Sequence, residues 1–363
     1  MSNAKYKRYL KQSIPFGIIW LVFAVVYTFL EFGILGDSKY YPSTGNLYDF
    51  KSSFIHSCIA GFLSGFIQGW IELVWLRKLF INRALWVKVV VKSIFYVSFI
   101  LIVLIIFSLL ANSRLLKLGL FDPLVIRSLY VFMQEFSFWS VVIYLGLISF
   151  VALLFSEIRE YVGMGVLYNF LLGKYHKPKQ EIRIFMFLDM KASTTIAESI
   201  GHKQYFKLIK KYYADMTDAI LETEGEIYQY VGDEIVVSWP ERKGIQHNNC
   251  IRCFKKIKDA FEKNKQEYIL EFGIAPDFKA GYHIGEVTIG EIGNIKKDII
   301  YTGDILNTTA RIQATCNTYK TKVLISEKLL LKLSKEKDFT HTKIGELELR
   351  GKKELVQLHS ISF

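Results

Sequence analysis

The sequence is poor in cysteine, and this limits the kinds of site that it can build. Its 363 residues include four cysteines, which provide no disulfide framework and agree with a reducing cytoplasm. Cys250 and Cys253 form a C-x-x-C pair, but no second pair accompanies them. Because the surrounding residues Phe254 and Ile257 continue a helical pattern, core packing is favoured over zinc or redox chemistry.

Acidic residues are missing from two segments that flank apolar stretches. Residues 1–13 contain four basic residues and no Asp or Glu, and residues 77–92 contain five basic residues and no acidic one. Basic flanks mark the cytoplasmic side of a membrane segment. No secretory cleavage site follows residue 13, so we expect a retained membrane anchor rather than a signal peptide.

Hydrophobic residues make up 51% of the chain, which predicts a membrane portion. Four apolar stretches each have roughly the 20 residues needed to cross a bilayer core. Four crossings with basic loops inside predict a multi-pass protein of the plasma or inner membrane with both termini in the cytoplasm. The net charge of +12 lies mainly beside these stretches, which favours lipid headgroups over nucleic acid as a partner. The stretches are 14–35, 54–76, 89–111 and 131–155.

Several polar residues lie within these stretches, where they are costly and often functional. They are candidates for a sensing site that binds an unknown ligand or partner at the membrane domain. A plain alternative exists for three of them, since two would lie near headgroup depth and one at a helix end, all solvated. The solvated alternative applies to Glu31, Glu72 and Glu135. The full set of candidates is Glu31, His56, Gln68, Glu72 and Glu135.

Two carboxylates follow apolar, β-prone runs in the second half of the chain. Asp189 ends a strand-like run and precedes small and hydroxyl residues that can open a helix, while Gly232 and Asp233 form the tip of a predicted hairpin. Each aspartate alone also fits a turn or cap. If the strands are neighbours, two like charges meet, and this is unfavourable unless cations lie between them. A pair of divalent cations that binds substrate phosphates satisfies this need.

A third motif, Ile299–Ile312, has the sequence IIYTGDILNTTARI. Together with FLDMKAST and YVGDE, in this order and at these spacings, it resembles the catalytic domain of class III nucleotidyl cyclases, over roughly residues 181–360. Beyond residue 181 the pattern predicts, among other elements, helices over about 202–222 and 246–270 and separate strands near 277–283 and 286–291. The resemblance and this alternation of strands and helices both indicate a ferredoxin-like α+β catalytic domain. We therefore expect an α-helical membrane domain with four transmembrane helices at 1–155, a helical linker at 156–180 and a cyclase catalytic domain at 181–363.

The resemblance implies roles for the central motif residues. Asp189 and Asp233 match the metal-binding aspartates, with the Met190 carbonyl as a further ligand, for two divalent cations, Mg²⁺ or Mn²⁺, per site. Asn307 and Arg311, four apart on one helix face, match the pair that orients the ribose and stabilises the transition state. In this family one domain lends the aspartates and another lends the Asn and Arg, so a chain with one such domain is expected to be a homodimer.

The triphosphate and the base require further contacts. Free amides at the start of the helix after Asp189 can hold phosphates. The resemblance places a basic residue, Arg350, on the terminal phosphates. These nucleotide-binding candidates are Lys191, Ala192, Ser193, Thr194 and Arg350.

The base-reading positions depart from the family pattern. Seven residues before Asn307 lies Ile300, which cannot hydrogen-bond adenine, but Asp298 and Thr302 lie on the same face of the strand. Lys279 is the candidate for the base-reading lysine, although strict alignment places Asp277 there. No Glu and Cys pair of the guanylate cyclases is present, so the sequence favours ATP over GTP. A guanylate cyclase and a catalytically inactive nucleotide-binding membrane receptor are the alternatives.

Overall fold

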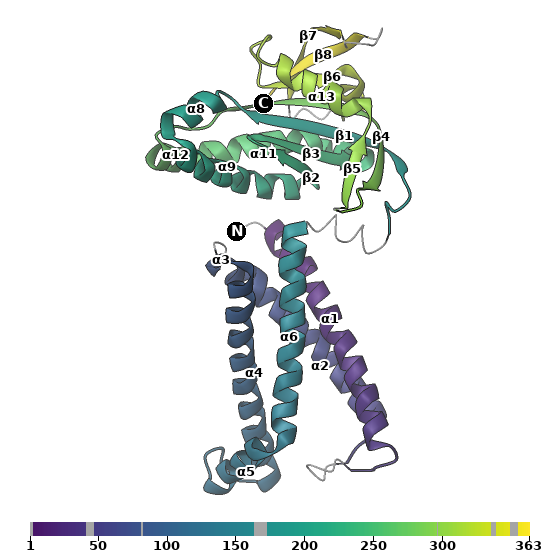
Figure 1. Ribbon diagram of the computed structural model, residues 1–363, viewed down its shortest axis with the longest axis vertical. Helices are drawn as coiled ribbons and strands as arrows, with labels where there is room; N and C mark the ends of the chain where they lie inside the picture. Colours follow the sequence, from purple (N-terminus) through teal and green to yellow (C-terminus); the bar gives the residue numbers. More distant parts are fainter. Residues whose placement is uncertain are drawn as a thin grey trace. The chain divides into compact units, whose positions relative to one another are not determined.

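The computed structural model describes residues 3–40, 47–80, 83–162, 173–295, 297–334, 339–348 and 355–363. The chain divides into two compact units, Met1–Met164 and Gly165–Phe363 (Figure 1). Part of the predicted linker, residues 163–172, lies outside the described residues, as does Arg350.

The first unit contains four helices that are long and apolar enough to span a membrane, as the sequence predicts. Helix α1 packs along α2, and α4 packs along α6 (Figure 1). A five-residue π-helix, η1, interrupts the second long helix near its end. The elements are α1 (Asn3–Leu35), α2 (Phe50–Ile71), η1 (Glu72–Leu76), α3 (Arg77–Leu79), α4 (Leu85–Leu116), α5 (Pro123–Gln134) and α6 (Phe136–Val162).

The fourth span begins five residues later than the apolar pattern predicts. Residues 131–134 belong to the short helix α5, and α6 starts at Phe136. Between them Glu135 has an extended backbone, with φ −72° and ψ 140°, so the helical hydrogen bonds cannot continue. Hydrophobicity alone does not reveal this break because both helices are apolar.

Small residues allow α1 and α2 to approach closely. Gly61, Gly65 and Gly69 repeat every four residues, so they lie on one face of α2. A Cβ atom at Gly65 would lie 2.5 Å from the Phe16 carbonyl oxygen of α1, a distance that a side chain cannot occupy. The contact also brings Gln68 of α2 into hydrogen-bonding reach of α1.

Four charged side chains are buried together in the first unit. Lys92 contacts Glu72 and lies 2.7 Å from Glu157, and Lys88 lies 3.5 Å from Glu157. Glu72 is therefore buried and paired, so the expectation that it is solvated near headgroup depth is wrong. Lys88 and Lys92, which the sequence pattern assigns to a basic loop, lie in α4. Burial of these charges is tolerable because each is paired.

The second unit is built around one mixed sheet with the strand order β2-β3-β1-β4-β6-β8-β7, and β5 pairs with β4. The connection β1–α9–β2–β3–α11–β4 with the order β2-β3-β1-β4 is that of a ferredoxin-like fold, which confirms the predicted fold class. The strands are β1 (Lys179–Met190), β2 (Glu226–Val231), β3 (Glu234–Pro240), β4 (Phe278–Ile292), β5 (Asp298–Thr302), β6 (Val323–Ser326), β7 (Thr340–Glu348) and β8 (Leu355–Ser362).

Helices cover the sheet and complete its core. Cys250 and Cys253 are fully buried in α11, and burial raises the pKa of each thiol to about 12, so both remain uncharged packing residues as predicted. The region predicted as one helix over 246–270 is divided, because Asn264 leaves the helical conformation between α11 and α12. The helices are α8 (Ser193–Ile200), α9 (His202–Glu222), α10 (Glu241–Ile245), η2 (Gln246–Asn248), α11 (Asn249–Lys263), α12 (Lys265–Phe272), α13 (Asp304–Thr315) and α14 (Glu327–Leu330).

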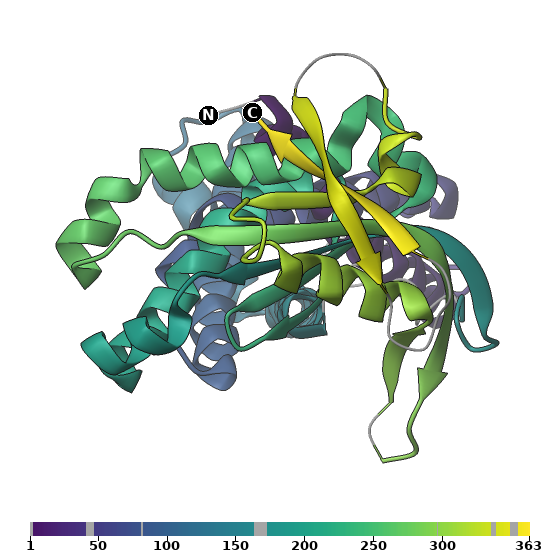
Figure 2. The same cartoon turned by 90° about the horizontal axis from the view of Figure 1, so that it is seen from above.

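Strand β4 is one continuous strand, although the sequence suggests two strands separated near Gly285. Strand β1 pairs with it along its whole length, from Lys179 opposite Ile289 to Met190 opposite Phe278, and so leaves no room for a turn. The far end of β4 pairs with β5, and this hairpin projects from the rest of the sheet (Figure 2).

Candidate active site

Asp189 lies at the end of the central strand, where the sequence predicts a carboxylate. Its strand is buried over Ile184–Leu188, which fixes the backbone that carries it. The chain then turns at Ala192, whose positive φ of 54° precedes helix α8. The Asp189 side chain therefore lies at the edge of the core rather than inside it.

Asp233 lies at the tip of the β2–β3 hairpin, and Gly232 before it has a positive φ of 61°, as a tight turn requires. Strand β3 pairs with β1 up to Leu188 opposite Ile235, so the hairpin tip reaches the end of β1. The Tyr213 hydroxyl of α9 lies 2.8 Å from the Gly232 carbonyl oxygen and 3.1 Å from that of Glu234. Tyr213 thus holds the backbone on both sides of Asp233.

The two aspartates are close enough to perturb one another. Burial, hydrogen bonding with Asp233 and repulsion by its charge together raise the pKa of Asp189 to about 6, against the opposing effects of Lys279 and Gln313. Burial and the same two aspartates raise the pKa of Glu234 to about 7. The structure therefore brings together the two carboxylates that the sequence predicts and adds a third acidic group beside them.

Two side chains contact Asp189 directly. The Gln313 amide Nε2 donates to Asp189 Oδ2 at 3.1 Å, and Lys279 Nζ lies 3.6 Å from the same oxygen. Lys279, predicted to read the base, is opposite Asp189 in the β1–β4 pairing and only 8% exposed. Gln313 was missed, and only its position on the same helix as Asn307 and Arg311 could have indicated it.

Close approach of α13 to β4 explains the Gln313 contact. A Cβ atom at Gly281 would lie 2.3 Å from the Gln313 backbone nitrogen, so only glycine fits there. Because position 281 has no side chain, the end of α13 packs directly against β4. This contact lies two positions along the strand from Lys279, so it places Gln313 close to Asp189.

The predicted phosphate-binding segment forms the start of helix α8. The helix begins at Ser193. Its N-cap residue is Ala192, whose side chain makes no capping hydrogen bond to the amides of the first turn. These amides carry the partial positive charge of the helix end. Lys191 is instead engaged by Asp277, 3.2 Å away, which also pairs with Lys322. Asp277, at the aligned base-reading position, is thus part of a surface ion-pair group.

Asn307 and Arg311 lie together on α13 but not beside Asp189. Arg311 precedes Gln313 by two residues, which turns its side chain roughly 160° away from that of Gln313. Asn307 is exposed and Arg311 half-buried. Within the described part of the chain, neither side chain hydrogen-bonds or forms an ion pair. Both are therefore available to groups outside this chain.

The base-reading candidates on β5 lie far from the aspartates of the same chain. Thr302 pairs with Thr288, and Ile300 pairs with Gly290, whereas Asp189 pairs with Lys279. Nine strand positions from Lys279 to Thr288 correspond to about 30 Å. Within one chain, Ile300 and Thr302 therefore do not reach the two aspartates.

The donor set near Asp189 fits hard divalent cations. Two adjacent carboxylates and a strand-end carbonyl are oxygen ligands of the kind that Mg²⁺ and Mn²⁺ prefer. Among the described residues, no cluster of three or more Asp, Glu, His or Cys side chains has the arrangement of a metal site. Such a set of two carboxylates leaves coordination positions for the oxygens of a bound phosphate.

The fold and the paired aspartates at the end of β1 define a nucleotidyl cyclase domain. Residues 174–361 match the family described as adenylate and guanylate cyclase catalytic domain, which is more than half of the chain. The chain belongs to this family, the class III nucleotidyl cyclases.

Two curated relatives and one solved structure illustrate the similarity. Adenylate cyclase 2 of Rhizobium meliloti (strain 1021) is 35% identical over 206 residues, which cover 57% of each chain. Adenylate cyclase of Anabaena cylindrica is 25% identical over 183 residues, covering 48% of this chain and 36% of the relative. The chain therefore spans about half the length of the curated relatives it matches. A bacterial light-regulated adenylyl cyclase structure shares the fold, with a TM-score of 0.53 at 18% identity over 63% of this chain and 66% of that one.

Proposed function

We propose that the protein is a membrane-anchored adenylate cyclase that converts ATP to 3′,5′-cyclic AMP and pyrophosphate as a homodimer. The observation that carries this proposal is the separation of the site into two halves. The aspartates lie at one end of β4, while Asn307 and Arg311 face away from them and have no partner among the described residues. A second copy of the chain, related by a two-fold axis, completes both halves at once.

In the proposed reaction, the ribose 3′-oxygen attacks the α-phosphorus. The bond from that phosphorus to the pyrophosphate oxygen breaks, and the hydroxyl proton is released. When bound, two divalent cations increase the acidity of the 3′-hydroxyl and neutralise the leaving pyrophosphate. Asp189, Asp233 and the Met190 carbonyl hold these cations. Asn307 of a second subunit orients the ribose, and Arg311 of a second subunit stabilises the charge that develops on the phosphorus oxygens.

The phosphates and the base have separate contacts in this proposal. The first-turn amides of α8, at Ser193 and Thr194, bind the phosphates, and Arg350 binds the terminal phosphate. Asp298 and Thr302 hydrogen-bond the base, with Ile300 packing against its face. Lys279 serves the aspartates rather than the base, because its ammonium group lies 3.6 Å from Asp189 Oδ2.

A nucleotide assay on the purified full chain in lipid nanodiscs tests this function. ATP or GTP is supplied with Mg²⁺ or Mn²⁺, and cyclic nucleotide and pyrophosphate are quantified. We expect cyclic AMP from ATP in at least one metal and none in the presence of EDTA. Cyclic GMP from GTP without ATP turnover would show a guanylate cyclase. Nucleotide binding without product in any condition would show an inactive receptor.

Two variants and one matched control assign the result to the site. Asp189→Asn and Asp233→Asn should each lower turnover by about a hundredfold or more, since each removes charge that holds the catalytic cations. Asp259→Asn removes an equal charge from an exposed position on α11 and should leave turnover unchanged. Equal activity of all three variants would refute the assignment.

The membrane part of the proposal concerns orientation. The four apolar helices are consistent with a membrane protein, and both termini and the catalytic unit are proposed to be cytoplasmic, where ATP is available. Residues 1–155 form the membrane domain and 156–180 the linker in this proposal, with 181–363 as the catalytic domain.

A further inference from the structure

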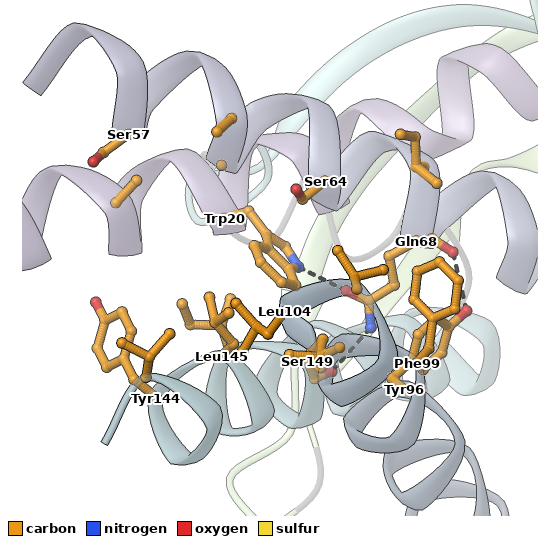
Figure 3. Close-up of a pocket in the computed structure, with 18 of the residues that line it drawn as sticks. Trp20, Ser57, Ser64, Gln68, Tyr96, Phe99, Leu104, Tyr144, Leu145 and Ser149 are labelled. Carbon is orange, nitrogen blue, oxygen red and sulfur yellow. Dashed lines mark hydrogen bonds between the residues drawn. The ribbon is translucent and has the colours of Figure 1, made fainter. Parts of the chain in front are cut away.

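The helices of the first unit line a partly open cavity of about 520 Å³. It lies between α1, α2, α4 and α6, within the segments that are long and apolar enough to span a bilayer (Figure 3). Along α2 it extends from Ser57 to Ile71, which corresponds to about 20 Å of helix. Its volume is within the range of about 300–1,000 Å³ found for pockets that bind drug-sized ligands.

The wall of the cavity is apolar and rich in aromatic side chains. Trp20, Tyr96 and Phe99 lie near one end, and Tyr144 lies toward the other (Figure 3). Among the described residues that line it, none is charged. An ion would lose its hydration without gaining a counter-charge there, so the lining selects an uncharged molecule. Aromatic walls favour a flat, conjugated one.

One end of the cavity carries polar groups that hold each other in place. Gln68 accepts a hydrogen bond from the Trp20 indole at 2.6 Å and donates to the Ser149 carbonyl oxygen at 3.4 Å. The Tyr96 hydroxyl donates to the backbone carbonyl oxygen of Gln68 at 3.2 Å. Helices α1 and α6 thus fix the Gln68 side-chain amide at the cavity wall, and α4 contacts its backbone (Figure 3).

The same end has hydrogen-bonding capacity that the described protein does not use. Ser149 is 1% exposed, and its hydroxyl has no hydrogen-bond partner. The Gln68 amide nitrogen makes one long hydrogen bond and has a second hydrogen to donate. A buried polar group without a hydrogen-bond partner is unfavourable, so an oxygen acceptor that reaches the Ser149 hydroxyl is stabilised. A carbonyl oxygen supplies such an acceptor without adding charge.

We propose that this cavity binds an uncharged, lipid-soluble aromatic or conjugated carbonyl compound, with its carbonyl oxygen toward Gln68 and Ser149 and its apolar body along α4 and α6. This binding is independent of the cyclase reaction, so the test requires no turnover.

Benzophenone is a suitable probe because it is an uncharged, conjugated aromatic ketone and forms a covalent bond to nearby C–H groups on irradiation. The full chain in lipid nanodiscs is irradiated with increasing benzophenone, and the labelled peptides are identified by mass spectrometry. Because the new bond forms at the carbonyl carbon, we expect saturable labelling of lining residues next to Gln68 and Ser149, such as Ile71 and Ile148. Labelling that does not saturate and follows the lipid-facing residues would mean partition into the bilayer only and would overturn the proposal.

Two variants give the site a matched comparison. Ser64→Phe places a ring in the cavity and should reduce labelling about tenfold or more, whereas Leu63→Phe adds a ring at its neighbour, which does not line the cavity, and should have no effect. Helical content by circular dichroism confirms that both variants are folded. Equal labelling of the two variants would overturn the proposal.

A smaller change tests the polar contact without filling the cavity. Ser149→Ala should weaken benzophenone binding by about 2–10-fold, the effect of one neutral hydrogen bond. Diphenylmethane, which has the same two rings but no carbonyl oxygen, should compete equally well in both proteins. Benzophenone binding that is unchanged by Ser149→Ala would show that the carbonyl is not directed to this end, contrary to the proposal.

Discussion

The separation of the proposed site into two halves makes a prediction that a mixed dimer can test. Asp189→Ala removes the metal-binding half of both sites in a homodimer, and Arg311→Ala removes the transition-state half of both. Each homodimer should lose at least about a hundredfold in turnover, the usual cost of removing one electrostatic stabiliser. In a dimer of one variant with the other, one of the two sites has both lesions and the other has neither.

The expected magnitude follows from this symmetry. A two-fold dimer has two equivalent sites, so the mixed dimer should turn over at about half the wild-type rate. The two variants carry different affinity tags, are expressed together and are purified through both tags in succession. Cyclic AMP formation is then measured per dimer. A single-chain site is inconsistent with the direction of the Arg311 side chain, which points roughly 160° away from that of Gln313, the residue of α13 that contacts Asp189.

A control pair distinguishes complementation from a general effect of mixing. Asn307→Ala and Arg311→Ala lie in the same half of the site, four residues apart on α13, so every site in their mixed dimer carries a lesion. This dimer should stay inactive. Recovery in the control pair, or none in verified Asp189→Ala with Arg311→Ala dimers, would refute the shared-site reasoning.

Two further predictions concern groups that the sequence did not identify. Lys92→Met leaves Glu72 and Glu157 buried without the cation that they share. It should lower the free energy of unfolding of the membrane unit by roughly 3–5 kcal/mol, measured as a lower thermal unfolding midpoint in detergent. An unchanged midpoint would contradict the buried pairing. Tyr213→Phe removes the hydroxyl that holds the backbone around Asp233, so it should raise the Mg²⁺ concentration needed for half-maximal cyclic AMP formation. Its unfolding midpoint should fall by only a few degrees, the effect of about 1 kcal/mol. A lower midpoint with an unchanged Mg²⁺ dependence would indicate a purely structural role.

Local signals in the sequence were sufficient where a feature depends on neighbours along the chain. Helix α9 spans 202–222 as predicted, because its apolar residues recur at helical spacing and Gly201 precedes it. The hairpin at Gly232 and Asp233 forms as predicted, because the turn residues set its geometry. The four apolar stretches are helices for the same reason, since length and composition alone define a candidate span.

Other features depend on residues that are distant in the sequence. The continuity of β4 through Gly285 follows from its pairing with β1, and the break at Asn264 has no strong local signal. The buried charges at Glu72 and Lys92 looked like solvated flanks, because one helix alone does not reveal which neighbour covers it.

The sequence by itself determined the family motifs, most of the strands and helices and the positions of two acidic groups at the ends of strands. Only the tertiary structure decided that Gln313 and Lys279 contact Asp189, while Asn307 and Arg311 face outward from the same helix. The physical reason is that periodicity along the chain fixes which side chains lie on the same face of a helix or strand. Which residues that face contacts depends on the pairing of β1 with β4 and on the close packing of α13 against Gly281.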